Sequence, residues 1–191
     1  YSKVSKKKNT MLDKSLTLNA SKNFRSTDTS ISLMASLGNY RTNILAKENV
    51  LKLVNNRYLV TTRLEQAFWD EKLSLSLEYS YYQTQNSVQN AGTTMREHQG
   101  SLGLSFFLVQ DLELFGDVSM NWLKDADYHE HESNANAGIR YKKKSIELEL
   151  LAQNLTNQKV YVVNKQVRES NYKYIYQLRP IGCMLSLKYN F

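Results

Sequence analysis

Hydrophobic and polar residues alternate one by one along most of this chain. The clearest stretch lies within 72–83. Every second residue there is apolar or aromatic, namely Leu73, Leu75, Leu77, Tyr79 and Tyr81, and the residues between them are mostly serines. Successive side chains of a β-strand point to opposite faces, so this stretch predicts a strand with one apolar and one polar face. Helical periodicity is hard to find anywhere in the sequence.

The same alternation recurs often enough to predict nine strands. They cover residues 12–24, 29–45, 57–69, 72–83, 97–108, 111–123, 134–142, 145–154 and 179–191. Soluble sheets favour strands of about five or six residues, whereas a tilted bilayer crossing needs about ten. The length of these strands therefore favours a membrane-spanning sheet.

The connections between these strands alternate between short and long. Tight turns are expected at 25–28, 70–71, 109–110 and 143–144. Long polar connections are expected at 46–56, 84–96, 124–133 and 155–178. This alternation is typical of outer-membrane barrels, which have short turns at one rim and loops at the other. The fold class predicted is all-β, an antiparallel up-and-down transmembrane β-barrel of about nine strands.

The residues on each face indicate what each face meets. The polar parity carries charged groups such as Asp117, Glu147 and Glu149, which suit a water-filled lumen. Aromatic residues gather at strand ends, with Trp69 at a short turn and Trp122 beside a long connection. Membrane barrels place aromatic girdles at these two levels. The apolar face is therefore expected to meet lipid.

Composition excludes several other classes of protein. One Cys in 191 residues excludes a disulfide framework and a Cys-rich zinc module. The longest apolar runs, 106–109 and 160–163, are far shorter than the roughly twenty residues of a spanning helix. The chain opens on Tyr1 with no initiator Met and no signal-type apolar segment, which predicts a fragment or a processed piece. An odd strand count agrees, because bacterial barrels close with even numbers.

A net charge of +7 raises the possibility of nucleic-acid binding. The two basic runs are 6–8 and 142–144, and the predicted topology places them at opposite rims. Solvated lysines are therefore the favoured interpretation, with no nucleic-acid partner. A soluble basic β domain that binds nucleic acid stays open as an alternative.

Candidate chemistry is sparse. The tetrad from His129 to Glu132 is the one metal-like cluster, but its histidines lack the i, i+4 spacing of a helical zinc site. No Gly-rich phosphate loop or Cys/His nucleophile pair is present, so we expect no enzyme, no catalytic residue, no metal and no cofactor. The candidate ligand-binding residues lie in the long connections and are Tyr128, His129, His131, Tyr172 and Tyr174.

The end of the chain resembles a known family. Asn154-Leu155-Thr156-Asn157 closes an alternating strand, a tyrosine-rich stretch leads to 176–180, and a last alternating strand ends on Phe191. This order resembles the C-terminal end of TonB-dependent receptors, the nutrient-uptake barrels of Gram-negative outer membranes. Thr156 departs from the aromatic residue usual in the family's motif.

The resemblance implies a barrel of about 22 strands with an N-terminal plug, which imports a bound ligand when TonB pulls on the plug. Residues 1–191 would then be the C-terminal segment of the wall, without the plug. The implied partners are outer-membrane lipid, TonB through the missing N-terminal part, and a possible surface lipoprotein. The barrel-assembly machinery would read the signal formed by Leu185, Leu187, Tyr189 and Phe191. The other membrane hypothesis is a complete small barrel with an adhesion or structural role.

Overall fold

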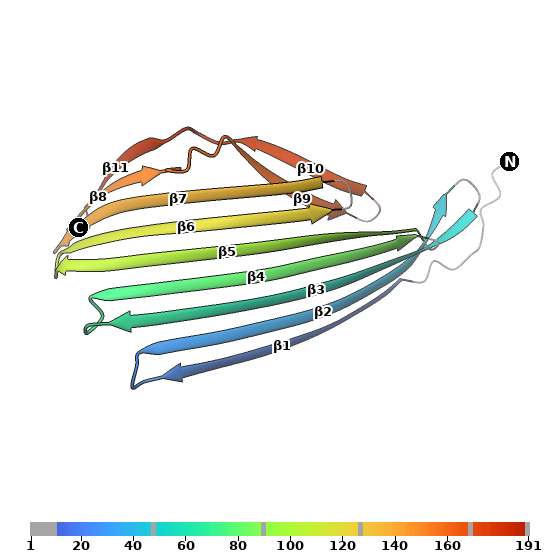
Figure 1. The fold of residues 1–191 in the computed structure, drawn as a ribbon, viewed down its shortest axis with the longest axis horizontal. Coiled ribbons are helices and arrows are strands. Elements are labelled where there is room, and N and C mark those ends of the chain that lie inside the picture. The colour runs from blue at the N-terminus through green and yellow to red at the C-terminus, as the bar shows by residue number, and fades with distance from the viewer. Residues whose placement is uncertain (1–10, 47–48, 89–90, 126–127, 168–169, 190–191) are drawn as a thin grey trace.

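The structure is a computed structural model that describes residues 11–46, 49–88, 91–125, 128–167 and 170–189. Its elements are strands, laid side by side in Figure 1. Their bounds are β1 (Leu12–Phe24), β2 (Thr29–Ala46), β3 (Asn49–Phe68), β4 (Leu73–Val88), β5 (Ala91–Val109), β6 (Leu112–Asp125), β7 (Tyr128–Lys143), β8 (Ile146–Gln153), β9 (Val160–Val167), β10 (Ser170–Gln177) and β11 (Gly182–Tyr189).

One antiparallel sheet holds nine of these strands. Strands β1 to β8 follow one another in chain order, and β11 pairs with β8. Within the described ranges β1 and β11 are the two edges, and β9 and β10 form a separate hairpin. The all-β, antiparallel up-and-down fold class is thus confirmed, with nine strands in the main sheet.

The register fixes the two faces of the sheet. Ser74, Ser101, Asp117 and Glu149 belong to one side, here called the inner face, and their chain neighbours belong to the outer face. Apolar residues of the outer face pair across the strands at many positions, as Leu75 does with Leu104 and Ile139 with Leu150, although some pairs, such as Gln66↔Leu75, are mixed. A register slip of one residue would invert both faces, so the hydrophobic pattern specifies the pairing.

The outer face is apolar and uncovered. Among the described residues only Leu53, Leu123 and Val162 are buried apolar residues, while Leu185 and Leu187 are 68% and 71% exposed. No second sheet covers this face in the described part of the chain, since the hairpin lies against the inner face. In addition, the described residues contain no helix that is both long and apolar enough to cross a membrane.

The strands are longer than the hydrophobic pattern predicted at one rim. Pairing continues to Ala46↔Asn49, Val88↔Ala91 and Asp125↔Tyr128, so most of the expected long connections are strand. The two faces do not differ in polarity there: both carry polar residues at 129–133, and both carry apolar residues at 51–54. A ladder of backbone hydrogen bonds needs no such contrast. Period-two alternation is therefore invisible in segments whose two faces have similar polarity.

The opposite rim has the predicted tight turns. Their positive φ angles fall on Asp28, on the run 69–71 and on Lys144. Aspartate tolerates this left-handed region better than most residues, which suits the first turn. Trp69 is 68% exposed at this rim, as expected for a girdle residue.

The hairpin of β9 and β10 was not predicted, because its residues were assigned to a long polar connection. The last strand is shorter than its predicted range of 179–191: β10 ends at Gln177, and β11 begins at Gly182, after Pro180. Residues 6–8 and Phe191 lie outside the described residues.

Candidate functional site

The inner face is concave. A hollow of about 810 Å³ near the tight-turn rim is lined by residues from six consecutive strands, β1 to β6. Polar groups such as Asn23, Ser76 and Asp117 contribute to its wall. A sheet of this curvature with a polar hollow side has the form of a barrel wall around water.

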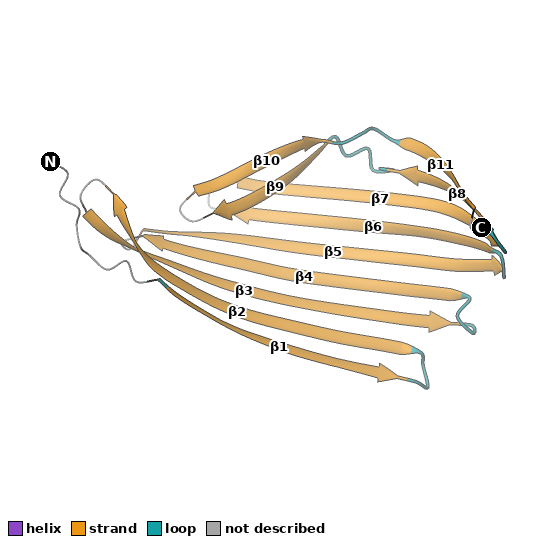
Figure 2. Ribbon diagram, turned by 180° about the vertical axis from the view of Figure 1, so that it is seen from behind, coloured by secondary structure: helices purple, strands orange, loops and turns teal. Residues whose placement is uncertain are grey.

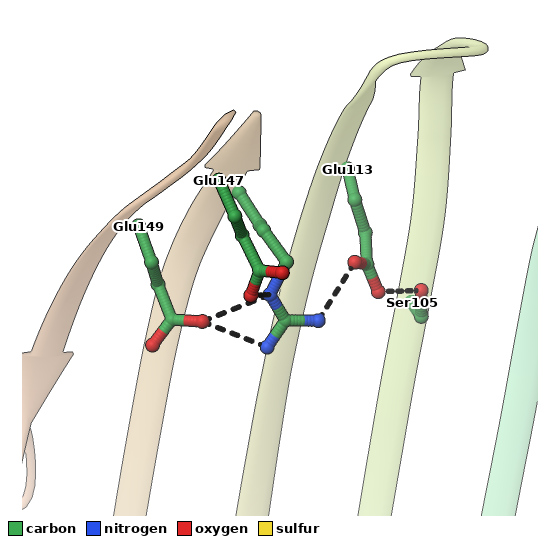
Figure 3. Close-up of polar contacts among 5 residues, drawn as sticks. Ser105, Glu113, Glu147 and Glu149 are labelled. Carbon is green, nitrogen blue, oxygen red and sulfur yellow. Dashed lines mark hydrogen bonds and ion pairs between the residues drawn. The ribbon is translucent and has the colours of Figure 1, made fainter. Parts of the chain in front are cut away.

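An ion-pair cluster stands on the inner face of β6, β7 and β8. The Arg140 Nη1 lies 2.9 Å from Glu113 Oε2, and its Nη2 lies 2.8 Å from Glu149 Oε2. Glu147 lies further away, with its Oε1 3.8 Å from Arg140 Nε. Figure 3 shows the three labelled glutamates converging from neighbouring strands. One guanidinium thus ties three strands together.

The cluster is supported on two further sides. Ser105 Oγ, from β5, donates a hydrogen bond to Glu113 Oε1 at 2.5 Å. The Arg140 guanidinium lies over the Phe115 ring, 4.6 Å from its centroid. Gly138 provides the space for that ring, because a Cβ there would come within 2.5 Å of Phe115 Cζ. Each of the three guanidinium nitrogens lies within 3 Å of a carboxylate oxygen, which indicates a structural tie between strands.

Asn154 fastens the base of the β9–β10 hairpin. Its Nδ2 donates to the carbonyl oxygens of Gln158, at 2.8 Å, and Arg179, at 2.6 Å. Its Oδ1 accepts the Gln158 N–H at 2.8 Å, and its own N–H donates to Asn136 Oδ1 at 3.0 Å. A positive φ of 54° lets the side chain reach both ends of the hairpin. The residue that carries the family resemblance therefore has a definite structural role.

From this base the hairpin lies over the inner face, where β9 overlaps β6 and β7 in Figures 1 and 2. The Val162 N–H donates to Glu132 Oε1 of β7 at 2.5 Å, and both residues are 6% exposed. Between Asn154 and β9, the Leu155 N–H and the Thr156 hydroxyl donate hydrogen bonds to the carbonyl oxygens of Ala135 and Ser133 in β7. A segment expected to be a long polar connection is thus held against the inner face of the sheet.

Two hollows lie between the hairpin and the sheet. The larger, about 310 Å³, is lined by Glu78, Asn121, Glu132, Asn134 and Tyr161 among others. The smaller, about 230 Å³, shares Asn121, Glu132 and Tyr161 and adds Glu97 and Glu130. Three buried acceptor oxygens on this lining have no hydrogen-bond partner within the described residues: Asn121 Oδ1, Glu132 Oε2 and Asn134 Oδ1.

The outer face carries a row of aromatic rings at the level of these hollows. Tyr81, His98, Trp122 and His131 are successive cross-strand partners on β4 to β7. The His98 ring lies 4.9 Å from the Tyr81 ring, and the Trp122 ring lies 5.3 Å from the His131 ring. Tyr79 OH and His98 Nδ1 are 2.8 Å apart. A row of rings at one level of the outer face resembles the aromatic girdle of a membrane barrel.

The predicted ligand-binding residues lie on two strands, β7 and β10. His129 and His131 belong to β7 and not to a loop, and they share the outer face with Trp122, away from the hollows. Tyr128 is the first residue of β7, and Tyr172 pairs with Lys165 in the hairpin. Tyr174 pairs with Val163, and its ring stacks on Tyr176 at 6.4 Å.

Strand alternation divides the tetrad that had suggested a metal. Glu130 and Glu132 belong to the inner face, whereas His129 and His131 belong to the outer face. Sequence reasoning had treated all four as one loop and so missed the glutamates as inner-face residues. Extending the alternation of 134–142 back to residue 130 would have placed Glu130 and Glu132 on the inner face.

The proposed assembly signal lies on an edge strand. Leu185, Leu187 and Tyr189 share the outer face of β11 and are exposed, and β11 pairs with β8 along its full length. Its other edge is unpaired within the described sheet. Phe191, the last residue of the signal, lies outside the described residues.

Comparisons with known proteins agree with the fold. No protein family and no curated protein matches the sequence at a significant level. Among solved structures, the chain is similar to in-vitro folded OmpT, an outer membrane protein of Vibrio cholerae. The sequence identity is 13% and the TM-score 0.50, over 93% of this chain and 55% of that one. The chain therefore spans about half the length of this neighbour. At this identity the likeness shows the fold alone.

Proposed function

We propose that the chain is part of the wall of an outer-membrane β-barrel that takes up a polar nutrient. The observation that carries this proposal is a single curved sheet with an uncovered apolar outer face and a polar, hollowed inner face. A soluble nucleic-acid-binding domain would need to bury the apolar face, and the described residues offer nothing to cover it. The similar fold of OmpT, an outer membrane protein, supports the proposal that this chain lies in the outer membrane of a Gram-negative bacterium.

The finer proposal is a TonB-dependent receptor, of which residues 1–191 are the C-terminal wall segment. It is supported by the motif at Asn154 and by the alternating last strand, which resemble that family. TonB would act through a plug belonging to the N-terminal part of the whole protein. A surface lipoprotein would be a further partner.

The unpaired edges of β1 and β11 fit this proposal. An up-and-down barrel closes only when its two edge strands pair, so further strands are expected to bridge them. The barrel-assembly machinery would engage β11 by strand addition, using Leu185, Leu187, Tyr189 and Phe191.

Heat-modifiable gel mobility tests the wall-segment proposal. Residues 1–191, expressed alone, should need detergent and should not give a compact band that shifts on heating. A compact, heat-modifiable band would instead indicate the complete small barrel. A stable monomer without detergent would overturn both membrane proposals.

Conductance tests the receptor proposal. The complete gene product, inserted in a planar bilayer in KCl, should show no steady current, because a plug fills the lumen of such a receptor. A steady ohmic current would contradict a plugged receptor and indicate an open pore.

A further inference from the structure

Carboxylates are arranged in levels along the wall beneath the hairpin. Glu97 and Glu130 both pair with Leu123 and form the first level, and Glu132 stands at the next level, beside Asn121. Glu78 stands one level deeper, opposite Ser101. Neighbouring levels differ by two residues, which is a distance of about 7 Å along a strand.

One oxygen of a buried carboxylate lacks a hydrogen-bond partner. Glu132 is 6% exposed, and its carboxylate is bonded by the Val162 N–H, at Oε1, and by the Asn121 side chain. Its Oε2 has no hydrogen bond within the described residues. A buried carboxylate oxygen that has lost its water and gained no hydrogen bond destabilises the folded protein. A ligand that donates a hydrogen bond to this oxygen removes that destabilisation.

The lining defines the chemistry of such a ligand. Asn121 Oδ1 and Asn134 Oδ1 are also acceptors without a hydrogen-bond partner among the described residues. The donors on this lining are neutral hydroxyl and amide groups. Among the described residues that line the two hollows there is no Lys, Arg or His. The described side chains also contain no group of three or more His, Cys, Asp or Glu residues placed to hold a metal ion. A positively charged donor with several N–H groups fits better than a metal ion.

We infer that the hollows beneath the hairpin bind a linear solute carrying two protonated amines. One ammonium would bond Glu132 Oε2 and the Asn121 amide oxygen. The other would lie one level away, near Glu97 and Glu130, while the alkyl chain lies along the Tyr161 ring, which also lines both hollows. The inference deepens the proposed function, since the solute reaches the hollows only if the inner face lines a lumen.

Equilibrium dialysis with radiolabelled 1,4-diaminobutane tests it on the purified complete gene product in detergent. The diamine should bind, and an equal concentration of 1,4-butanediol, which has the same length without charge, should not displace it. Glu132→Gln keeps the bond from Val162 but removes the charge, and it should weaken binding by about tenfold or more. Glu65→Gln, a carboxylate elsewhere on the sheet that pairs with Arg63, should change binding less than about twofold.

Three results would overturn the inference: no diamine binding, equal displacement by the diol, or unchanged binding by Glu132→Gln. If Glu132→Gln fails to assemble, as judged by its gel mobility, Glu130→Gln takes its place with the same expectation. Binding in detergent needs neither TonB nor transport. An open-pore conductance would therefore overturn the receptor proposal and leave the diamine result standing.

Discussion

Gly138 shows how closely the inner face is packed around the arginine cluster. A Cβ at this position would stand 2.5 Å from the Phe115 ring and 2.8 Å from the Leu150 carbonyl oxygen. The ring can move only by leaving the Arg140 guanidinium that it stacks against, and the carbonyl belongs to the ladder of β8. The absence of a side chain is therefore what lets the cluster form.

We expect Gly138→Ala to lower the free energy of unfolding by about 1–3 kcal/mol, the usual cost of overpacking. Gly100→Ala is the matched control, because a Cβ there meets nothing closer than the Trp122 ring at 4.0 Å. Urea unfolding of the membrane-assembled protein compares the two. Equal effects from both substitutions would mean that Gly138 is not tightly packed.

Arg140 compensates the charges of carboxylates that are themselves sheltered. The side chains of Glu113 and Glu149 are 14% and 17% exposed. Arg140→Met leaves them facing each other without a cation, so we expect a loss of about 2 kcal/mol or more in stability. Arg63→Met removes an exposed pair with Glu65 and should cost less than about 1 kcal/mol. The same urea titration measures both, and a smaller loss for Arg140→Met than for Arg63→Met would contradict the assigned role.

At the scale of elements, the Asn154 side chain fastens the base of the β9–β10 hairpin. Asn154 combines a positive φ with bonds to both chain ends, and Gly keeps the first property while losing the second. We therefore expect Asn154→Gly to speed hydrogen exchange of the hairpin amides, in line with a local loss of about 2 kcal/mol. Mass spectrometry of the exchanged peptides measures this.

Asn157 provides the control for that experiment. It shares a positive φ, of 55°, and its side chain is exposed. Asn157→Gly should leave the exchange of the hairpin unchanged. If both variants exchange alike, or neither does, the hairpin is not held by the Asn154 side chain.

The sequence predicted these elements well where one face is apolar and the other polar. All nine strands of the sheet were found, and β1 matches its predicted range, 12–24. The alternation lost its contrast near the far rim, so the first half of β3 and the start of β7 were assigned to connections. In these two segments the strands are held by backbone pairing, which side-chain polarity does not predict.

The site was harder to predict than the fold. The hairpin's position depends on contacts between residues far apart in the sequence, such as Val162 with Glu132, separated by 30 positions. Local patterns carry no information about such a contact. The tetrad at His129 illustrates the same limit, because its division between two faces follows only once residues 129–132 are known to be strand.

At the scale of the whole molecule, the proposed function makes the sheet a partition between two environments. Its outer face offers leucines and an aromatic row, and its inner face offers carboxylates, amides and serines. Among the described residues only three apolar residues are buried. The proposal therefore expects stability to come from the ladder of backbone hydrogen bonds and from transfer of the outer face into lipid.

Cysteine labelling of adjacent positions on one strand tests this central claim most directly. In the protein assembled in bilayers, with Cys183→Ser as background, single cysteines replace Ser101 on the inner face and Leu102 on the outer face of β5. We expect a membrane-impermeant maleimide to label position 101 and not 102. We also expect a fluorophore attached in detergent at 102, and not one at 101, to be quenched by spin-labelled lipid after reconstitution. Equal labelling by the maleimide with no lipid quenching at 102 would contradict the account, because the apolar face would then be in water.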